Sequence, residues 1–246
     1  MGRWSRVLAR RFIGEIDPPS GLRWLDVGCG TGALTEAIAD LAQPSGIVGV
    51  DTSPAYLEVA RNNLGDRADL FAAGGDDLPF DDGEFDVVAS ALALNFMPDP
   101  LSALTEWRRV VRSNGPVYAY VWDYAGRMGF LRAFWDAAIS LDPASRQLDQ
   151  AERFTICRPE ALQSAFEEVG FNDVATGNVE ITTRFTSFED YWAPFLGGTG
   201  PAGGYVASLD DLQRERLVSA VRDVVTESPD GSIELPARAW TAVGIR

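Results

Sequence analysis

Short apolar runs alternate with segments of helical spacing in the first half of the chain. Residues 22–27 (LRWLDV) and 46–50 are apolar runs that predict strands, and residues 34–41 carry apolar positions at helical spacing. Ser53 is a typical N-cap residue and Pro54 suits the first helical turn, so a helix is predicted to begin there. The predicted order is a strand–helix–strand unit followed by another helix.

The same alternation continues to residue 122. Residues 69–72, 85–90 and 117–122 predict three further strands, and residues 101–111 predict a helix. Strands that are apolar throughout are typical of a sheet that is buried on both faces. We therefore predict an α/β protein with a Rossmann-like, mostly parallel sheet and helices on both faces.

The second half of the chain contains longer helices and two late strands. Helices are predicted over residues 130–141 and 158–169, the second of them closed by Gly170. Residues 173–185 and 235–245 predict strands, which brings the sheet to seven strands.

The segment between the two late strands is predicted to be a cap inserted before the last strand. It contains the stretch FLGGTGPAGGY, a predicted glycine-rich loop, and an amphipathic helix near residues 209–225. Tyr191 and Tyr205 flank this loop, and such loops are typical of segments that move over an active site. The predicted regions are an N-terminal helical or lid segment (1–20), a core (21–186 and 232–246) and the cap (187–231).

Composition and charge narrow the range of partners. The 246 residues are 46% hydrophobic and 23% charged, as expected of a soluble globular domain. The 36 acidic and 21 basic residues give a net charge of −15, which disfavours nucleic-acid and anionic-lipid partners. The basic cluster Arg3, Arg6, Arg10 and Arg11 either serves an anionic ligand or forms a solvated helix face.

Cysteine and histidine usage limits the chemistry. Only Cys29 and Cys157 are present, and no secretory leader or integral membrane segment is visible, which favours a cytoplasmic protein. The chain has no histidine, so no metal site of the usual zinc or haem kind is expected. A general base, where one is needed, has to be a carboxylate, a tyrosine, an amine or water.

A glycine-rich turn follows the first strand. Gly28, Gly30 and Gly32 let the backbone bend sharply and let a ligand approach the start of the next helix. Asp51 ends the second strand, where a carboxylate can accept from ribose hydroxyls. A tight turn without a nucleotide is the alternative, and the spacing G-x-G-x-G differs from the dinucleotide pattern G-x-G-x-x-G.

Four motifs in register resemble those of class I S-adenosylmethionine-dependent methyltransferases. They are LDVGCGTG, VGVDTS, GGDDLPFDDGEFDVVAS and the strand after Asn114-Gly115-Pro116, over roughly residues 22–122. The resemblance is closest to the branch with ubiquinone and menaquinone C-methyltransferases. It implies S-adenosylmethionine as cofactor, S-adenosylhomocysteine as product and a small molecule as methyl acceptor.

The resemblance also implies roles for individual residues. The three glycines would face the methionine and ribose part of the cofactor, with Asp26 near its amino group and Asp51 at the ribose. An acid of the Asp76-Asp77 pair would accept from the adenine amino group, and the doubled acid leaves open which of them does. The implied cofactor-binding residues are Asp26, Gly28, Gly30, Gly32, Asp51, Thr52, Asp76, Asp77, Leu78, Ser90, Ala91 and Leu92.

Methyl transfer from a sulfonium mainly requires alignment and exclusion of water. The polar groups best placed to meet an acceptor follow the predicted strands and are Asn95, Asp123 and Tyr124. A structural role is as well supported for two of them, as a strand-end cap for Asp123 and as a turn residue for Asn95. The aromatic residues of the later segments favour an apolar or aromatic acceptor. The alternatives are a non-catalytic protein that binds the cofactor or its product, and an NAD-dependent oxidoreductase.

Overall fold

Seven strands form one sheet in the computed structural model, which describes residues 2–198 and 200–246. The strand order across the sheet is β3-β2-β1-β4-β5-β7-β6. The strands are β1 (Arg23–Val27), β2 (Gly46–Asp51), β3 (Asp69–Ala72), β4 (Val87–Ala91), β5 (Pro116–Trp122), β6 (Asn172–Phe185) and β7 (Ile233–Ile245).

The first five strands are parallel and the seventh reverses. β1 pairs in parallel with β2 and β4, β2 with β3, and β4 with β5. The N–H of Arg246 donates to the carbonyl of Gly115, and that of Asp123 donates to Arg238, so β7 runs antiparallel to β5. The predicted α/β fold with a mostly parallel seven-stranded sheet is confirmed.

The chain divides into two compact units. Unit 1 comprises Met1–Val121, Arg158–Val179 and Ala239–Arg246, and unit 2 comprises Trp122–Cys157 and Glu180–Arg238. The predicted cap of residues 187–231 lies within unit 2, which also contains residues 122–157. The predicted boundaries of the lid segment, core and cap stay a prediction.

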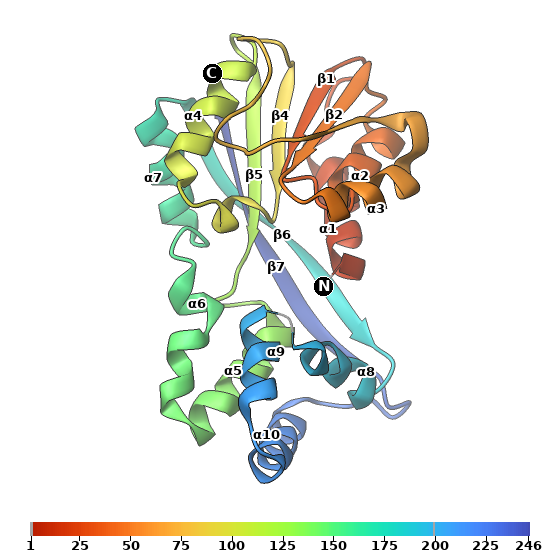
Figure 1. Cartoon of the computed structure of the whole chain (residues 1–246), viewed down its shortest axis with the longest axis vertical. Helices are drawn as coiled ribbons and strands as arrows, with labels where there is room; N and C mark the ends of the chain where they lie inside the picture. The colour runs from red at the N-terminus through yellow and green to blue at the C-terminus, as the bar shows by residue number, and fades with distance from the viewer. Residues whose placement is uncertain (1, 199) are drawn as a thin grey trace. The chain divides into compact units, whose positions relative to one another are not determined.

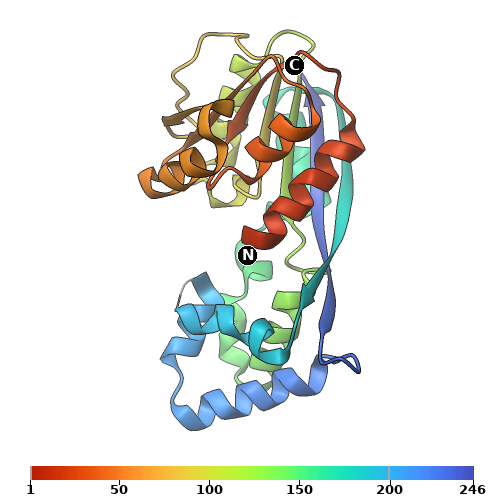
Figure 2. The same cartoon turned by 90° about the vertical axis from the view of Figure 1, so that its right-hand side faces the viewer.

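Unit 1 has helices on both faces of its strands. The first three helices lie together on one side, where α1 packs against α2, and α4 packs against α7 on the other (Figure 1). Figure 2 views the strands from the side of α1 and α2. These helices are α1 (Gly2–Ile16), α2 (Ala33–Leu41), α3 (Pro54–Leu64), α4 (Pro100–Val110) and α7 (Pro159–Val169).

Unit 2 packs its helices around a cluster of aromatic rings. Phe195 stacks on Phe130 and on Phe134 with ring centroids 4.6 and 4.4 Å apart, and Tyr191 donates to the carbonyl of Phe130. The aromatic residues that the sequence singled out thus form a buried core. The helices are α5 (Gly129–Leu141), α6 (Gln150–Arg153), α8 (Phe188–Trp192), α9 (Gly200–Ser208) and α10 (Asp211–Val224), with 3-10 helices at Pro143–Leu148 and Ala193–Gly197.

Most helix ends lie where the sequence signals predict them. The hydroxyl of Ser53 accepts from the N–H of Tyr56, and Pro54 occupies the first turn of α3. Gly170 closes α7 in the left-handed conformation, with a φ of 86°. None of the described helices is long and apolar enough to cross a bilayer.

The prediction of a glycine-rich loop in the cap is wrong from residue 200 onward. Residues 200–208 form the helix α9, with Pro201 in its first turn. Ala202, Tyr205 and Val206 are buried, and a Cβ at Gly203 would lie 3.1 Å from the backbone of Gly198. Tertiary packing therefore outweighs the low helix propensity of glycine, and residue 199 lies outside the described part of the chain.

Two glycines of unit 1 should respond oppositely to alanine. A Cβ at Gly115 would lie 2.9 Å from the carbonyl oxygens of Arg112 and Asp86, so Gly115→Ala should lower the free energy of unfolding by about 1–3 kcal/mol. A Cβ at Gly14, within α1, would meet nothing within 4 Å. Gly14→Ala should raise the free energy of unfolding by about 0.5–1 kcal/mol. Urea titration of both variants measures the two effects, and a shift of the same sign for both would contradict the packing.

Candidate functional site

The turn between β1 and α2 bends around the carboxyl end of β2. The N–H groups of Gly28 and Cys29 both donate to the carbonyl of Val50, at 2.8 and 2.9 Å. The φ angles of Gly28, Gly30 and Gly32 are 74°, 55° and 88°, in the left-handed region that favours glycine. A Cβ at Gly28 would also collide with Ala93, so this turn requires glycine for both conformation and space.

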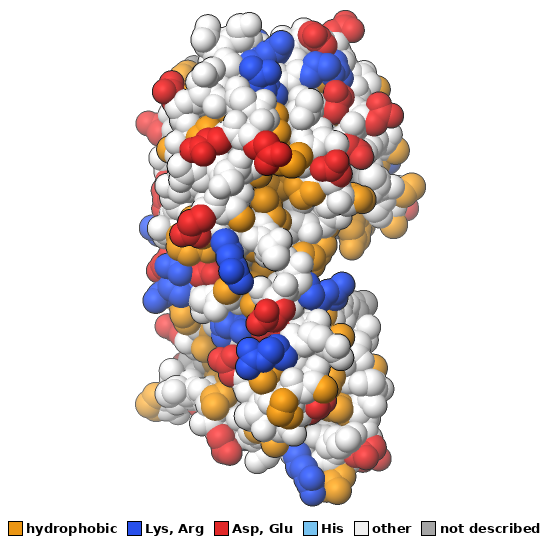
Figure 3. Space-filling view, turned by 90° about the vertical axis from the view of Figure 1, so that its left-hand side faces the viewer, with side chains coloured by type: hydrophobic (Ala, Val, Ile, Leu, Met, Phe, Trp, Pro, Cys, Tyr) orange, Lys and Arg blue, Asp and Glu red, His pale blue; other side chains and the backbone are white. Residues whose placement is uncertain are grey.

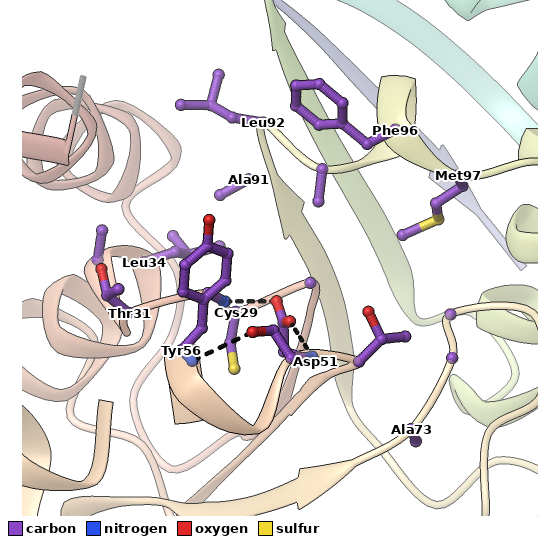
Figure 4. Close-up of a pocket in the computed structure, with 18 of the residues that line it drawn as sticks. Cys29, Thr31, Leu34, Asp51, Tyr56, Ala73, Ala91, Leu92, Phe96 and Met97 are labelled. Carbon is purple, nitrogen blue, oxygen red and sulfur yellow. Dashed lines mark hydrogen bonds between the residues drawn. The ribbon is translucent and has the colours of Figure 1, made fainter. Parts of the chain in front are cut away.

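A cavity of about 700 Å³ opens beside this turn, within unit 1. Its volume lies in the range of roughly 300–1,000 Å³ that is usual for small-molecule sites. In Figure 4, Phe96 and Met97 lie across the cavity from Thr31 and Leu34. The walls come from the glycine turn, the start of α2, the end of β2, α3, residues 73–76, the end of β4 with the 3-10 helix Leu94–Phe96, and β5.

Asp51 holds two segments of the cavity wall together. One carboxylate oxygen accepts from the N–H of Gly30 at 2.9 Å, and the other accepts from the N–H of Ser53 at 2.8 Å (Figure 4). Because each oxygen has two lone pairs, each keeps the capacity to accept one more hydrogen bond. The carboxylate is therefore oriented and still able to bind hydroxyl groups.

Asp26 lies at the end of β1 and is fully buried. Its Oδ2 accepts from the hydroxyl of Thr35 at 2.6 Å, whereas Oδ1 has no partner among the described residues. Burial raises the pKa of Asp26 from 3.8 to about 7. The nearby charge of Asp51 also raises this pKa, whereas the hydrogen bonds from Thr35 lower it. Asp26 does not form part of the cavity wall.

The loop after β3 is tied to α4. The indole N–H of Trp107 donates to the carbonyl of Gly75 at 2.9 Å, and the guanidinium of Arg109 donates to the carbonyls of Leu78 and Phe80. Asp76 lies in the cavity wall, whereas its neighbour Asp77 does not. The structure thus distinguishes the two acids that the sequence left equivalent.

The end of β4 supplies an apolar wall. Leu92, Phe96 and Met97 line the cavity, and Phe96 is 64% exposed. Leu92 has a φ of 59°, which costs a non-glycine residue about 1–2 kcal/mol. The N–H of Leu92 donates to the carbonyl of Tyr120 at 2.8 Å, which holds this conformation.

The predicted cofactor-binding residues divide into two groups. Gly28, Gly30, Asp51, Thr52, Asp76, Ala91 and Leu92 line the cavity. Asp26, Gly32, Asp77, Leu78 and Ser90 do not. The roles of both groups in cofactor binding stay predictions.

Ser90 and Asn95 are buried polar groups near the end of β4. Ser90 is 1% exposed and, by the alternation along a strand, lies on the opposite face of β4 from Ala91. Asn95 is 8% exposed, and neither of its amide atoms has a hydrogen-bond partner among the described residues. Neither side chain lines the cavity.

The other two catalytic candidates lie in unit 2. Asp123 accepts from the N–H groups of Gly126 and Arg127 and pairs with Arg238, at 2.7 Å between Oδ2 and Nη2. These contacts fit the alternative role of a strand-end cap, which the sequence also allowed. Tyr124 is 6% exposed and lies against Phe154.

Several wall residues had no motif signal. Tyr56 follows the predicted N-cap Ser53 by three positions, and Tyr120 is the register partner of Ala91 on β5. Strand alternation places Tyr120 on the same face as Ala91, so the pairing of β4 with β5 would have identified it. Phe96 and Met97 follow β4 without a recognisable pattern.

Comparison with known proteins agrees with this geometry. Residues 25–119 match the family model described as a methyltransferase domain. The chain is 29% identical over 184 residues to the demethylmenaquinone methyltransferase of Staphylococcus aureus, covering 69% of this chain and 76% of that protein.

Solved structures share the fold. A protein from Bacillus halodurans assigned as a methyltransferase superposes with a TM-score of 0.63 at 15% identity, covering 96% of this chain and 97% of that one. An assigned S-adenosylmethionine-dependent methyltransferase from Methanococcus maripaludis has a TM-score of 0.53 at 24% identity, covering 70% and 79%. Residues 25–119 thus carry a methyltransferase domain, and the comparisons support S-adenosylmethionine as its cofactor. The resemblance drawn from the four motifs is confirmed, and the comparisons favour it over the oxidoreductase alternative.

Three of the arginines of α1 form ion pairs with acidic residues. Arg6 pairs with Glu36 and Arg10 with Asp40 on α2, and Arg11 pairs with Glu15. These ion pairs favour the interpretation of the basic cluster as a solvated helix face over its interpretation as a binding site for an anionic ligand. Figure 3, which views the molecule from the side of α4 and α7, also shows acidic and basic side chains interspersed.

The buried carboxyl of Asp26 should make the free energy of unfolding depend on pH. Between about pH 4 and 7, folded Asp26 keeps its proton while the unfolded chain loses it, so stability falls as the pH rises through this window. A rise in pKa from 3.8 to about 7 corresponds to roughly 4 kcal/mol. Above pH 7, the Asp26→Asn variant should therefore have a higher free energy of unfolding than the native protein. The difference between the two free energies should decrease toward pH 4.

Urea unfolding at several pH values measures this gap. Asp76→Asn removes an exposed carboxylate of the same cavity and is the matched control. A gap between Asp26→Asn and the native protein that stays constant with pH would contradict the assignment.

Proposed function

We propose that the chain transfers a methyl group from S-adenosylmethionine, held in the cavity of unit 1, to a small apolar or aromatic acceptor. The observation that carries this proposal is one cavity that combines an oriented carboxylate, Asp51, with an apolar wall. The position of the cavity, outside the carboxyl ends of parallel strands, is the usual ligand position in open α/β sheets.

The glycine turn fits the cofactor sterically. A Cβ built at Gly30 meets nothing within 4 Å, although Gly30 lines the cavity, so the missing side chain leaves room for a ligand. We assign Gly28 and Gly32 to shaping this turn, because a Cβ at either would press on Ala93 or Leu64.

Charge and hydrogen-bonding groups fit the cofactor as well. The two free acceptor positions of Asp51 match the two ribose hydroxyls, and Asp76 lies in the wall to receive the adenine amino group. The N-cap of α2, Gly32, provides no side-chain cap, and Ala33 and Leu34 line the cavity. The N–H groups of this first turn favour the cofactor carboxylate.

When bound, the cofactor supplies an electrophilic methyl group on a sulfonium. The protein aligns the acceptor with that group and excludes water. Leu92, Phe96 and Met97 are the residues that we propose to hold the acceptor and keep the site dry.

The side chains on this wall favour an acceptor that ionises easily. The sequence has neither histidine nor lysine, and Leu92, Phe96 and Met97 carry no titratable group. A phenol or hydroquinone-like ring lowers the need for a strong base, because its own oxygen or activated carbon is nucleophilic. The relative named demethylmenaquinone methyltransferase supports the same class.

The proposed cofactor position predicts that a larger side chain in the glycine turn weakens cofactor binding. Gly30→Val places methyl groups in the cavity and should reduce S-adenosylmethionine affinity by at least tenfold. Gly21→Val is the matched control, because Gly21 also has a positive φ and open surroundings but lies outside the cavity wall. Calorimetric titration of both folded variants measures the difference, and equal affinities would refute the cofactor position.

The acceptor wall predicts a specific loss of activity. Burying a phenylalanine against a ligand contributes about 1.5–3 kcal/mol, so Phe96→Ala should lower kcat/KM for the acceptor about tenfold or more. The Kd of S-adenosylmethionine should not change. Phe71→Ala, an exposed phenylalanine outside the cavity wall, is the control.

The assay screens small phenols and hydroquinones for the mass gain of one methyl group. Methylation of a member of this panel, impaired by Phe96→Ala and not by Phe71→Ala, is the expected result. A panel without any methylated product would exclude the acceptor class.

A further inference from the structure

Tyr120 lies near the end of β5 and lines the cavity of unit 1. Its Cα is in register with that of Ala91 on β4, so both side chains lie on the same face of the sheet. The carbonyl of Tyr120 accepts from the N–H of Leu92 at 2.8 Å. Because Leu92 begins the apolar wall that we propose to hold the acceptor, Tyr120 lies beside that wall.

The position of β5 separates Tyr120 from the groups that we propose to bind the nucleoside. In the strand order β3-β2-β1-β4-β5, three spacings lie between β5 and β2, the strand that ends at Asp51. At about 4.8 Å for each spacing, these two strands are roughly 14 Å apart. Asp76 follows β3, one strand beyond β2. Tyr120 therefore lies on the side of the cavity away from the proposed ribose and adenine positions.

Packing fixes the ring of Tyr120. The ring centroid of Phe12, on α1, lies 4.8 Å from that of Tyr120, with the two planes tilted by 51°. Tyr120 is only 1% exposed. A tyrosine ring with two side-chain torsions loses little conformational entropy when it is held in this way. Its hydroxyl is therefore presented in one place.

The hydroxyl of Tyr120 has a free hydrogen-bonding capacity. It forms no hydrogen bond with any described residue, and its oxygen is not one of the fully enclosed polar atoms that lack a partner. The oxygen therefore keeps access to space that the protein does not fill, and the space that Tyr120 lines is the cavity. Because a buried tyrosine hydroxyl usually has a partner, a ligand atom in the cavity is the natural one.

The hydroxyl acts as a donor rather than as a base. Burial holds the pKa of Tyr120 well above its usual value, and the charge of Asp26 acts in the same direction. The phenol therefore keeps its proton at neutral pH. A hydrogen bond donated to the oxygen that drives the attack on the methyl group would occupy a lone pair and lower its nucleophilicity. The donor thus suits a different oxygen of the acceptor.

We infer that Tyr120 is a specificity-determining residue whose hydroxyl donates a hydrogen bond to a second ring oxygen of the methyl acceptor. The preferred acceptor is then a ring with two oxygen substituents rather than a simple phenol. An acceptor that lacks the second oxygen leaves the buried hydroxyl unpaired, which costs affinity. This inference rests on the proposed function, because it takes the wall at the end of β4 as the acceptor site.

Calorimetric titration of the protein saturated with S-adenosylhomocysteine tests the inference without methyl transfer. The probes are hydroquinone and phenol, which differ by one ring oxygen. The native protein should bind hydroquinone about tenfold or more tightly than phenol. Tyr120→Phe should bind the two rings with nearly equal affinity, because the donor that distinguishes them is gone.

Tyr118→Phe is the matched control. Tyr118 lies two residues earlier on the same face of β5 and contacts the same Phe12 ring, with centroids 5.8 Å apart, but it lies outside the cavity wall. This variant should keep the preference of the native protein for hydroquinone. Both variants should keep the native affinity for S-adenosylhomocysteine.

The Tyr120→Phe variant should fold normally. Its hydroxyl has no partner among the described residues, so its removal breaks no hydrogen bond within the protein and should not lower the free energy of unfolding. Urea unfolding checks this. A change in ring preference without a loss of stability distinguishes ligand binding from a structural role.

The outcomes separate this inference from the proposed function. No binding of S-adenosylhomocysteine, or of either ring to the saturated native protein, would overturn the proposed function and the inference with it. Equal affinities of the native protein for the two rings, or the same preference in the native protein and Tyr120→Phe, would overturn only the role of Tyr120. A loss of S-adenosylhomocysteine affinity in Tyr120→Phe would assign the hydroxyl to the cofactor and overturn the inference as well.

Discussion

Three backbone N–H groups fasten the turn after β1 to the end of β2. Those of Gly28 and Cys29 share the carbonyl of Val50, and that of Gly30 donates to the carboxylate of Asp51. The remaining geometry of the site depends on this junction, because it sets the direction of α2 and the orientation of Asp51 at once. Only glycine at position 28 satisfies both the positive φ and the contact with Ala93.

The cavity has two sides of opposite character as a result. The polar side is built from backbone amides and the carboxylates of Asp51 and Asp76, which suit a nucleoside. The apolar side comes from the end of β4, where Leu92 is held in a strained conformation by the carbonyl of Tyr120. Strain of this kind concentrates at functional sites. In the proposed function, a polar cofactor and an apolar acceptor would meet at these strand ends.

Asp26, at the end of β1, is a buried carboxyl with no cation paired to it among the described residues. A buried carboxyl with one unpaired oxygen lowers the stability of the ligand-free protein at neutral pH. The stability of the ligand-free protein therefore depends on pH.

The sequence by itself determined the seven strands, the helix ends at Ser53 and Gly170, and the position of Asp51, because these depend on local periodicity, caps and the order of elements. Only the tertiary structure put Asp76 rather than Asp77 in the cavity wall, added Phe96 and Tyr120 to that wall, and turned residues 200–208 into a helix. Those outcomes depend on side-chain direction and on packing between distant segments. Local sequence patterns do not encode either of them.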